Sequence, residues 1–224
     1  MARPLTLAEI THEIRTGEME RRPANFRGAT LSTLYLMEKK LGIGLDLENA
    51  VILGPVSMAD SSLDGDINFK NAKIQGSIYM SEAEINGGLD LSFAQAQGVI
   101  NLVGSKIRGS LNAQGLEVNG FLSLAKAQIL GNLNLRNLIL KNANYEGLTV
   151  VGDLYLNRAI IQGGVDLTEA FIEGTLDLTV ISVNHSADLT SAQVGNLLIL
   201  RDALIKGDLI LKDTKYKKMI KHYL

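Results

Sequence analysis

Residues 65–97 read GDINFKNAKIQ, GSIYMSEAEIN and GGLDLSFAQAQ, three consecutive units of eleven residues that each begin with glycine. Further units in the same pattern start at Gly98, Gly109, Gly120, Gly152, Gly163, Gly174 and Gly207. The consensus of these units is G-x-L-x-L-x-x-A-x-I-x. An internal repeat of this kind predicts an array of similar packing units rather than an irregular globule.

The spacing of the apolar positions predicts strands. An eleven-residue repeat could also indicate a right-handed helical coiled coil. In a helix, however, the glycine of each unit would cost about 1 kcal/mol relative to alanine. Apolar positions 3 and 5, and again 8 and 10, lie two residues apart, which is the side-chain period of a β-strand. Each unit therefore predicts two short strands with a corner between them.

Divided at its corners, the chain becomes alternating blocks of five and six residues, such as LDLSF and AQAQGV at residues 89–99. In this form it resembles the pentapeptide-repeat family, whose unit reads A-[DN]-L-x-x. Ala24-Asn25-Phe26-Arg27-Gly28 and Ala187-Asp188-Leu189-Thr190-Ser191 are close copies of that unit. The sixth residue of every second block departs from it and resembles the pentapeptide-like subset of the family. The resemblance covers residues 24 to about 216 and implies an all-β, right-handed quadrilateral β-helix, a solenoid.

With four faces per turn, as the resemblance implies, the array has about nine coils of about 22 residues. Neighbouring strands lie ~4.8 Å apart, so the rod should be roughly 40 Å long. One block, residues 138–142, lacks its sixth residue. We expect a tightened corner there.

Four stacked columns of inward side chains should fill the tube. Burying one such side chain contributes about 1.5–3 kcal/mol, and each coil needs its neighbours to close its core. The predicted columns are Leu47, Phe69, Leu91, Ala113, Leu135, Leu156, Leu178 and Leu200; Met58, Met80, Leu102, Leu124, Tyr145, Leu167, Leu189 and Leu211; Ile52, Ile74, Ala96, Val118, Leu140, Ile161, Val183 and Ile205; and Leu63, Ile85, Ile107, Ile129, Val150, Ile172, Val194 and Tyr216.

Short polar side chains recur between the inward residues on two opposite faces. They could form a ladder that binds a ligand or ion. The favoured interpretation is that they point outward and bond to the backbone of the adjacent turn, because they follow the repeat itself. They are Asp46, Asn68, Asp90, Asn112 and Asn134 on one face, and Asn101, Asn144, Asp166 and Asp188 on the other.

Residues 1–23 are predicted to form an N-terminal capping segment that contains a helix. Thr6-Leu7-Ala8-Glu9 is a capping-box pattern. Leu7, Ile10 and Ile14 then fall on one helical face, and Gly17 can end the helix. Such a segment would cover the open strand edges of the first coil.

The β-helix is predicted over residues 24–216, and residues 217–224 form a C-terminal cap or dimerisation tail. Apolar residues at outward positions of the last coils, and in the tail, suggest a surface that is covered. Two interpretations stay open: the tail covers it within the chain, or two chains form a homodimer through their C-terminal ends. The candidate partner or dimer contacts are Ile199, Leu204, Ile210, Met219 and Ile220.

Composition narrows the classes of function. The 224 residues carry 22 basic and 24 acidic side chains, a net charge of −2, so no bulk charge favours direct nucleic-acid binding. Cysteine is absent, which excludes disulfides, thiolate metal sites and a cysteine nucleophile. No apolar run approaches the ~18 residues of a transmembrane segment. We expect a soluble, cytoplasmic protein.

No motif indicates catalysis, a cofactor or a metal. Ser110 and Ser123 have no nearby histidine base in the predicted array. Gly42-Ile43-Gly44 lacks the third glycine and the helix of a dinucleotide-binding loop. The histidines, which lie far apart in the array, are His12, His185 and His222. We therefore expect that the protein is not an enzyme.

Two functions remain in competition. The first is a non-enzymatic scaffold whose flat faces bind proteins. The second is a DNA mimic that binds a topoisomerase (gyrase), which the resemblance implies because some pentapeptide-repeat proteins confer quinolone resistance in that way. A DNA mimic needs an acidic exterior, whereas Lys70, Lys106 and Lys126 interrupt the acids here. A third class, a catalytic accessory or membrane-associated factor, has no supporting residue.

Overall fold

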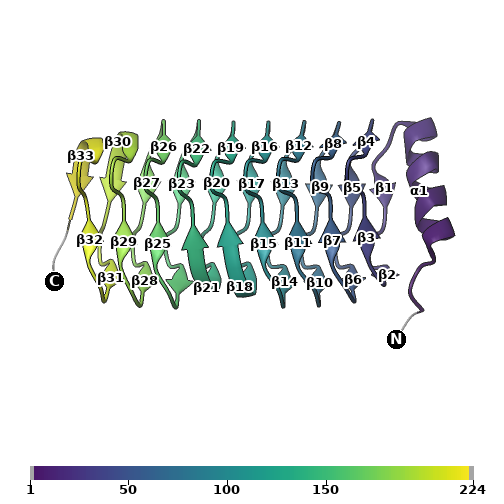
Figure 1. Ribbon diagram of the computed structural model, residues 1–224, viewed down its shortest axis with the longest axis horizontal. Coiled ribbons are helices and arrows are strands. Elements are labelled where there is room, and N and C mark those ends of the chain that lie inside the picture. The colour runs from purple at the N-terminus through teal and green to yellow at the C-terminus, as the bar shows by residue number, and fades with distance from the viewer. Residues whose placement is uncertain (1–2, 222–224) are drawn as a thin grey trace.

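The computed structural model describes residues 3–221 as one helix followed by short parallel strands that wind into a rod (Figure 1). Four strands make one coil, and each pairs with the equivalent strands of the neighbouring coils. Leu89 and Leu111 are Cα partners on one face, and Lys73 and Gln95 on another, each 22 residues apart. These pairings confirm an all-β, four-sided solenoid of about nine coils with an N-terminal helix.

The strands form four faces, numbered in chain order within one coil. The first face contains β1 (Ala24–Asn25), β5 (Leu45–Asp46), β9 (Ile67–Asn68), β13 (Leu89–Asp90), β17 (Leu111–Asn112), β20 (Leu133–Asn134), β23 (Leu154–Tyr155) and β27 (Leu176–Asp177). The second contains β2 (Thr30–Leu31), β6 (Val51–Ile52), β10 (Lys73–Ile74), β14 (Gln95–Ala96), β24 (Ile160–Ile161), β28 (Ser182–Val183) and β31 (Leu204–Ile205).

The third face lies opposite the first and contains β3 (Leu34–Tyr35), β7 (Val56–Ser57), β11 (Ile78–Tyr79), β15 (Ile100–Asn101), β25 (Val165–Asp166), β29 (Ala187–Asp188) and β32 (Leu209–Ile210). The fourth contains β4 (Lys40–Leu41), β8 (Ser62–Leu63), β12 (Glu84–Ile85), β16 (Lys106–Ile107), β19 (Gln128–Ile129), β22 (Thr149–Val150) and β26 (Phe171–Ile172). Four longer strands continue through a corner and join two faces: β18 (Glu117–Ser123) and β21 (Ile139–Asn144) join the second and third, while β30 (Gln193–Ile199) and β33 (Lys215–Ile220) join the fourth and first.

The sequence predicts a tightened corner at residues 138–142, where a block lacks its sixth residue. The structure has no tightened corner there. Instead, β21 runs through the corner as one strand, and its register with β18 shifts between Val118 and Phe121. Asn119 and Gly120 of β18 therefore lie opposite Lys141 alone. A bulge in the neighbouring strand absorbs the deletion without disturbing the coils on either side.

A second one-residue deletion, in the last coil, is not evident from the sequence. The register of β30 with β33 shifts between Val194 and Leu197, opposite Lys217. The pattern of two apolar residues separated by one is broken there, so the sequence predicts a tail after residue 216. The chain continues through that boundary as β33, up to Ile220.

The predicted columns belong to the core, which also contains further inward residues such as Ile67, Leu89 and Leu111. The members of the predicted columns from Leu47 through Val194 are buried, most of them completely. Only the last coil differs: Ile205 and Leu211 are partly buried, and Tyr216 is 39% exposed. Tyr216 keeps the inward register, since its Cα partner is the buried Val194, so its exposure follows from its place at the end of the tube.

Corners of two kinds alternate around each coil. Between the first and second faces, and between the third and fourth, one residue adopts the left-handed conformation, for example Asn71 (φ 57°) and Glu82 (φ 54°). The other two corners carry most of the repeat glycines, and there the backbones of successive coils touch. A Cβ atom on Gly109 would lie 2.8 Å from both Cα and N of Gly88. The glycine of the consensus is thus a requirement of stacking.

Helix α1 (Leu7–Glu20) lies across the N-terminal end of the rod (Figure 1). Thr6 and Glu9 form the predicted capping box, and Ile10 is buried while Ile14 packs against the core. One detail of the prediction was wrong: the helix continues past Gly17 to Glu20. Gly17 is buried, and a Cβ there would lie 2.9 Å from the Ile43 side chain. Leu7, on the same helical face as Ile10 and Ile14, is 78% exposed. Within residues 3–221, no helix is long and apolar enough to cross a membrane.

Tyr145 places a hydroxyl group in the apolar core. Its side chain is fully buried and its Oη has no hydrogen-bond partner. Burial raises the pKa of the Tyr145 phenol far above its ordinary value. An unpaired buried hydroxyl costs about 1–3 kcal/mol, so this residue is a local defect in an otherwise regular column.

We expect Tyr145→Phe to raise the free energy of unfolding by about 1–2 kcal/mol, because the ring is kept and only the unpaired hydroxyl is lost. Tyr155→Phe is the matched control. The Tyr155 hydroxyl donates to Asp153 at 2.7 Å, so its removal should destabilise slightly. Chemical denaturation of the two variants measures this difference, and a loss of stability in Tyr145→Phe would contradict it.

Candidate functional site

The outward polar residues of the first and third faces bond locally. On the first face the N–H of Lys70 donates to Asn68 Oδ1 at 2.9 Å, and the N–H of Ser92 donates to Asp90 Oδ1 at 2.8 Å. All nine residues predicted from the sequence accept such a bond from the residue two positions later. The prediction that these side chains bond to the backbone of the adjacent turn is therefore confirmed.

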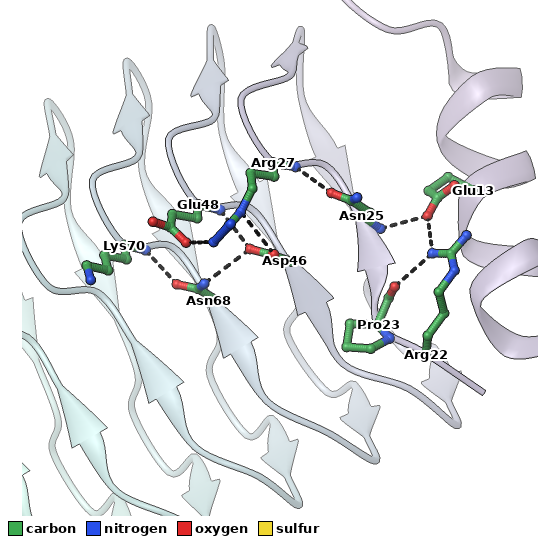
Figure 2. A network of polar contacts seen from close by, with 9 residues as sticks. All are labelled: Glu13, Arg22, Pro23, Asn25, Arg27, Asp46, Glu48, Asn68 and Lys70. Carbon is green, nitrogen blue, oxygen red and sulfur yellow. Dashed lines mark hydrogen bonds and ion pairs between the residues drawn. The ribbon is translucent and has the colours of Figure 1, made fainter. Parts of the chain in front are cut away.

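Bonds between coils extend this arrangement along the first face. The Asn68 amide donates to Asp46 Oδ1 at 3.1 Å (Figure 2), and Asn134 donates to Asn112 at 3.0 Å. Asparagine and aspartate alternate from Asp46 to Asn112, so no two carboxylates are Cα partners in this part of the first face. An amide between two carboxylates supplies a donor and avoids repulsion between like charges.

A shallow groove on the first face is lined by polar atoms that are already paired. Asp66 Oδ1 accepts the N–H of Gly88 at 2.7 Å, and Ser110 Oγ accepts the N–H of Asn132 at 3.1 Å. The groove follows the corner glycines 88 and 109. Its donors and acceptors serve the stacking of coils.

Other residues considered from the sequence lie apart. His12 is in α1, and His185 lies at a corner where its ring nitrogen is 3.2 Å from the carbonyl oxygen of Gln162. His222 lies outside the described residues. Ser123 is buried in β18, and Gly42-Ile43-Gly44 connects β4 to β5. Across residues 3–221, no three His, Cys, Asp or Glu side chains group as a metal site would require.

The candidate contact residues at the C-terminal end do not share one surface. Ile199 and Ile220 are Cα partners on the first face. Leu204 is on the second face and Ile210 on the third. Met219 is the partner of the buried Leu198, so it belongs to an inward column.

An apolar cluster in the middle of the rod was missed by the sequence analysis. Ile139 and Ile160 are Cα partners on the second face and are 40% and 48% exposed. Phe121, at the neighbouring corner, is 44% exposed. Outward positions of the repeat vary in residue type. This cluster would become evident from the sequence only if the outward residues of the second face were aligned coil by coil.

The cap helix is fixed to the first coil by a polar network (Figure 2). Glu13 accepts hydrogen bonds from Arg22 at 2.5 Å and from the N–H of Asn25 at 2.7 Å. The Arg22 guanidinium, helped by the Asn25 N–H and opposed by burial, lowers the pKa of Glu13. Arg27 then pairs with Glu48 of the next coil.

We expect this network to make the attachment of α1 pH-dependent, because the pKa of Glu13 is lowered on folding. A carboxyl group whose pKa is lowered on folding stabilises fully above its unfolded pKa, about 4.3. That stability disappears as the pH falls through the folded pKa. We expect Glu13→Gln to lower the melting temperature at pH 7, and we expect the gap from the unmodified protein to close below about pH 4. Glu18→Gln, an exposed change on the same helix, is the control. An equal gap at pH 7 and pH 3 would contradict the role of Glu13.

Stacked parallel strands on four faces, with repeated inward side chains, define the class of the molecule: a parallel β-solenoid. A scan of protein-family models, a search of curated proteins and a search of solved structures each returned no match to this chain. The class is therefore established by the fold and the sequence repeat.

Proposed function

We propose that this protein is a non-catalytic scaffold of the pentapeptide-repeat type, located in the cytoplasm, which binds other proteins through its flat faces. The observation that carries the proposal is the exposed pair of Ile139 and Ile160 on the second face, with exposed Phe121 at the corner that follows this face. Adjacent exposed apolar side chains on a rigid surface are typical of protein contacts. A partner lying along this face would bury both isoleucines.

The distribution of charge supports a protein scaffold over a DNA mimic. Glu84 and Lys106 are Cα partners on the fourth face, and Arg27 pairs with Glu48 between coils. Acids and bases therefore share the same columns. A DNA mimic would need rows of acids uninterrupted by cations, spaced like phosphates.

Capture from the native cell tests the scaffold. The variant Ile139→Lys/Ile160→Lys changes only exposed side chains of the second face. The control, Thr149→Lys/Gln193→Lys, adds the same charges to the opposite face. We expect the unmodified protein and the control to retain the same captured protein, and the second-face variant to lose it, with equal melting temperatures for all three. Retention by the second-face variant would exclude this face as the contact.

A gyrase supercoiling assay tests the alternative directly. We expect supercoiling to be unchanged when the purified protein is added. Inhibition that depends on protein concentration would instead favour the DNA mimic.

A further inference from the structure

The C-terminal coil ends in an apolar floor. By register, Ile205, Leu209 and Tyr216 continue the columns of Val183, Ala187 and Val194, which are buried. In the last coil Ile205 and Leu209 are only partly buried and Tyr216 is exposed, since no residue between 3 and 221 stacks on them. Figure 1 shows this coil as the last at one end of the rod, opposite α1.

Basic side chains surround this floor. From residue 201 to residue 221 the chain has seven basic and three acidic residues, a net charge of +4, whereas the whole chain carries −2. All seven basic residues are exposed. None forms a salt bridge within residues 3–221, where the ion pairs involve Arg3, Arg22 and Arg27. The basic residues are Arg201, Lys206, Lys212, Lys215, Lys217, Lys218 and Lys221.

The opposite end of the rod shows what fits such an opening. There α1 lays Ile10 and Ile14 on the first coil. Its Glu13 carboxylate binds Arg22 and the N–H of Asn25 beside them. An amphipathic helix with a carboxylate at the edge of its apolar face therefore closes the end of this tube.

We infer that the C-terminal end binds an amphipathic helical segment of another protein, with an apolar face bordered by carboxylates. This goes beyond the proposed function, because the site is separate from the second face. Apolar contact with Leu209, Leu211 and Tyr216 and ion pairs with the surrounding lysines are the interactions that recognise it.

A second copy of this chain fits the end poorly. Tail-to-tail association would bring two clusters of charge +4 together within the ~10 Å Debye length at 0.1 M salt. Association with the N-terminal end would require displacing α1. An anionic membrane would attract the lysines. The apolar side chains of this end, however, occupy inward positions of the last coil, enclosed by its backbone, where a helix reaches them more readily than lipid chains do.

The test uses the full chain and three labelled probes. Two are designed helical peptides of 14 residues with the same leucines at positions i, i+3, i+4 and i+7, one with glutamate and one with lysine at the bordering positions. The third is a vesicle of phosphatidylcholine with one fifth phosphatidylserine. We expect the glutamate peptide to bind at least about tenfold more tightly than the lysine peptide, with affinity falling as salt increases.

Variants locate the binding. Lys215→Glu/Lys218→Glu should weaken binding of the glutamate peptide about tenfold or more, and Lys70→Glu/Lys73→Glu, far along the rod, should leave it unchanged. Equal binding by both variants, equal binding of the two peptides, or no peptide binding would overturn the proposal. Preferential binding of the vesicle would replace it with a membrane contact, and a dimer in sedimentation would replace it with self-association.

Discussion

Ile129→Asp and Leu124→Asp are each expected to unfold the array. Both side chains are completely buried, one on the fourth face and one on the third. Each substitution loses the ~1.5–3 kcal/mol of an apolar burial and places a carboxylate without a partner in the core, which costs several kcal/mol more. The sum is comparable to the total stability of most domains, about 5–15 kcal/mol.

Circular dichroism on heating measures this effect, and Gln128→Asp is the matched control. Gln128 precedes Ile129 in β19 and is exposed, so the same new charge faces water there. We expect a normal melting curve for Gln128→Asp and no cooperative transition for Ile129→Asp. An unchanged melting temperature for either inward variant would refute the assignment of the columns.

Gly109→Ala is expected to cost about 2–3 kcal/mol, because the added methyl group meets backbone atoms that no rotamer change can move. Its Cβ would lie 2.8 Å from Gly88 Cα and N and 2.9 Å from Gly87 C. The loss corresponds to a fall in melting temperature of about 5–10 °C for a chain of this size.

Gly42→Ala separates this contact from a general effect of replacing glycine. No atom lies within 4 Å of a Cβ built on Gly42. We expect its melting temperature to stay within about 2 °C of the unmodified protein. Equal destabilisation by the two substitutions would show that stacking of corners is not the reason for the glycine of the repeat.

The sequence was sufficient to predict the interior because the period is strict there. Leu102 and Ile107 could be placed inside from their spacing alone, and both are fully buried. The ends were harder, since a terminal coil lacks one neighbour to fix its phase. The last coil is one residue shorter than the coil before it, because Lys217 alone lies opposite two residues of β30. Met219 could therefore be assigned to an inward column only from the pairing of β33 with β30.

Contacts between separate elements account for the other differences. Glycine occupies position 17 of α1 because the helix approaches Ile43 too closely for a larger side chain. The helix continues through it, so tertiary packing outweighs the low helix propensity of glycine. The repeat predicts Tyr145 inside the tube, where it lies, but the lack of a partner for its hydroxyl depends on side chains from other coils and cannot be read from the repeat. Ile139 and Ile160 lie side by side because they are Cα partners on adjacent coils. The coil that contains Lys141 is one residue shorter, which changes the residues that pair between coils.

The hydrogen bonds that join successive coils point along the rod, as between the N–H of Leu89 and the carbonyl oxygen of Ser110. A force that pulls the two termini apart would therefore open these bonds a few at a time rather than shear a whole ladder at once. Each released turn of 22 residues could extend to about 75 Å, compared with the ~4.8 Å it occupies when folded. The molecule should yield under tension as a series of small, equal steps, starting from whichever terminus is held less firmly.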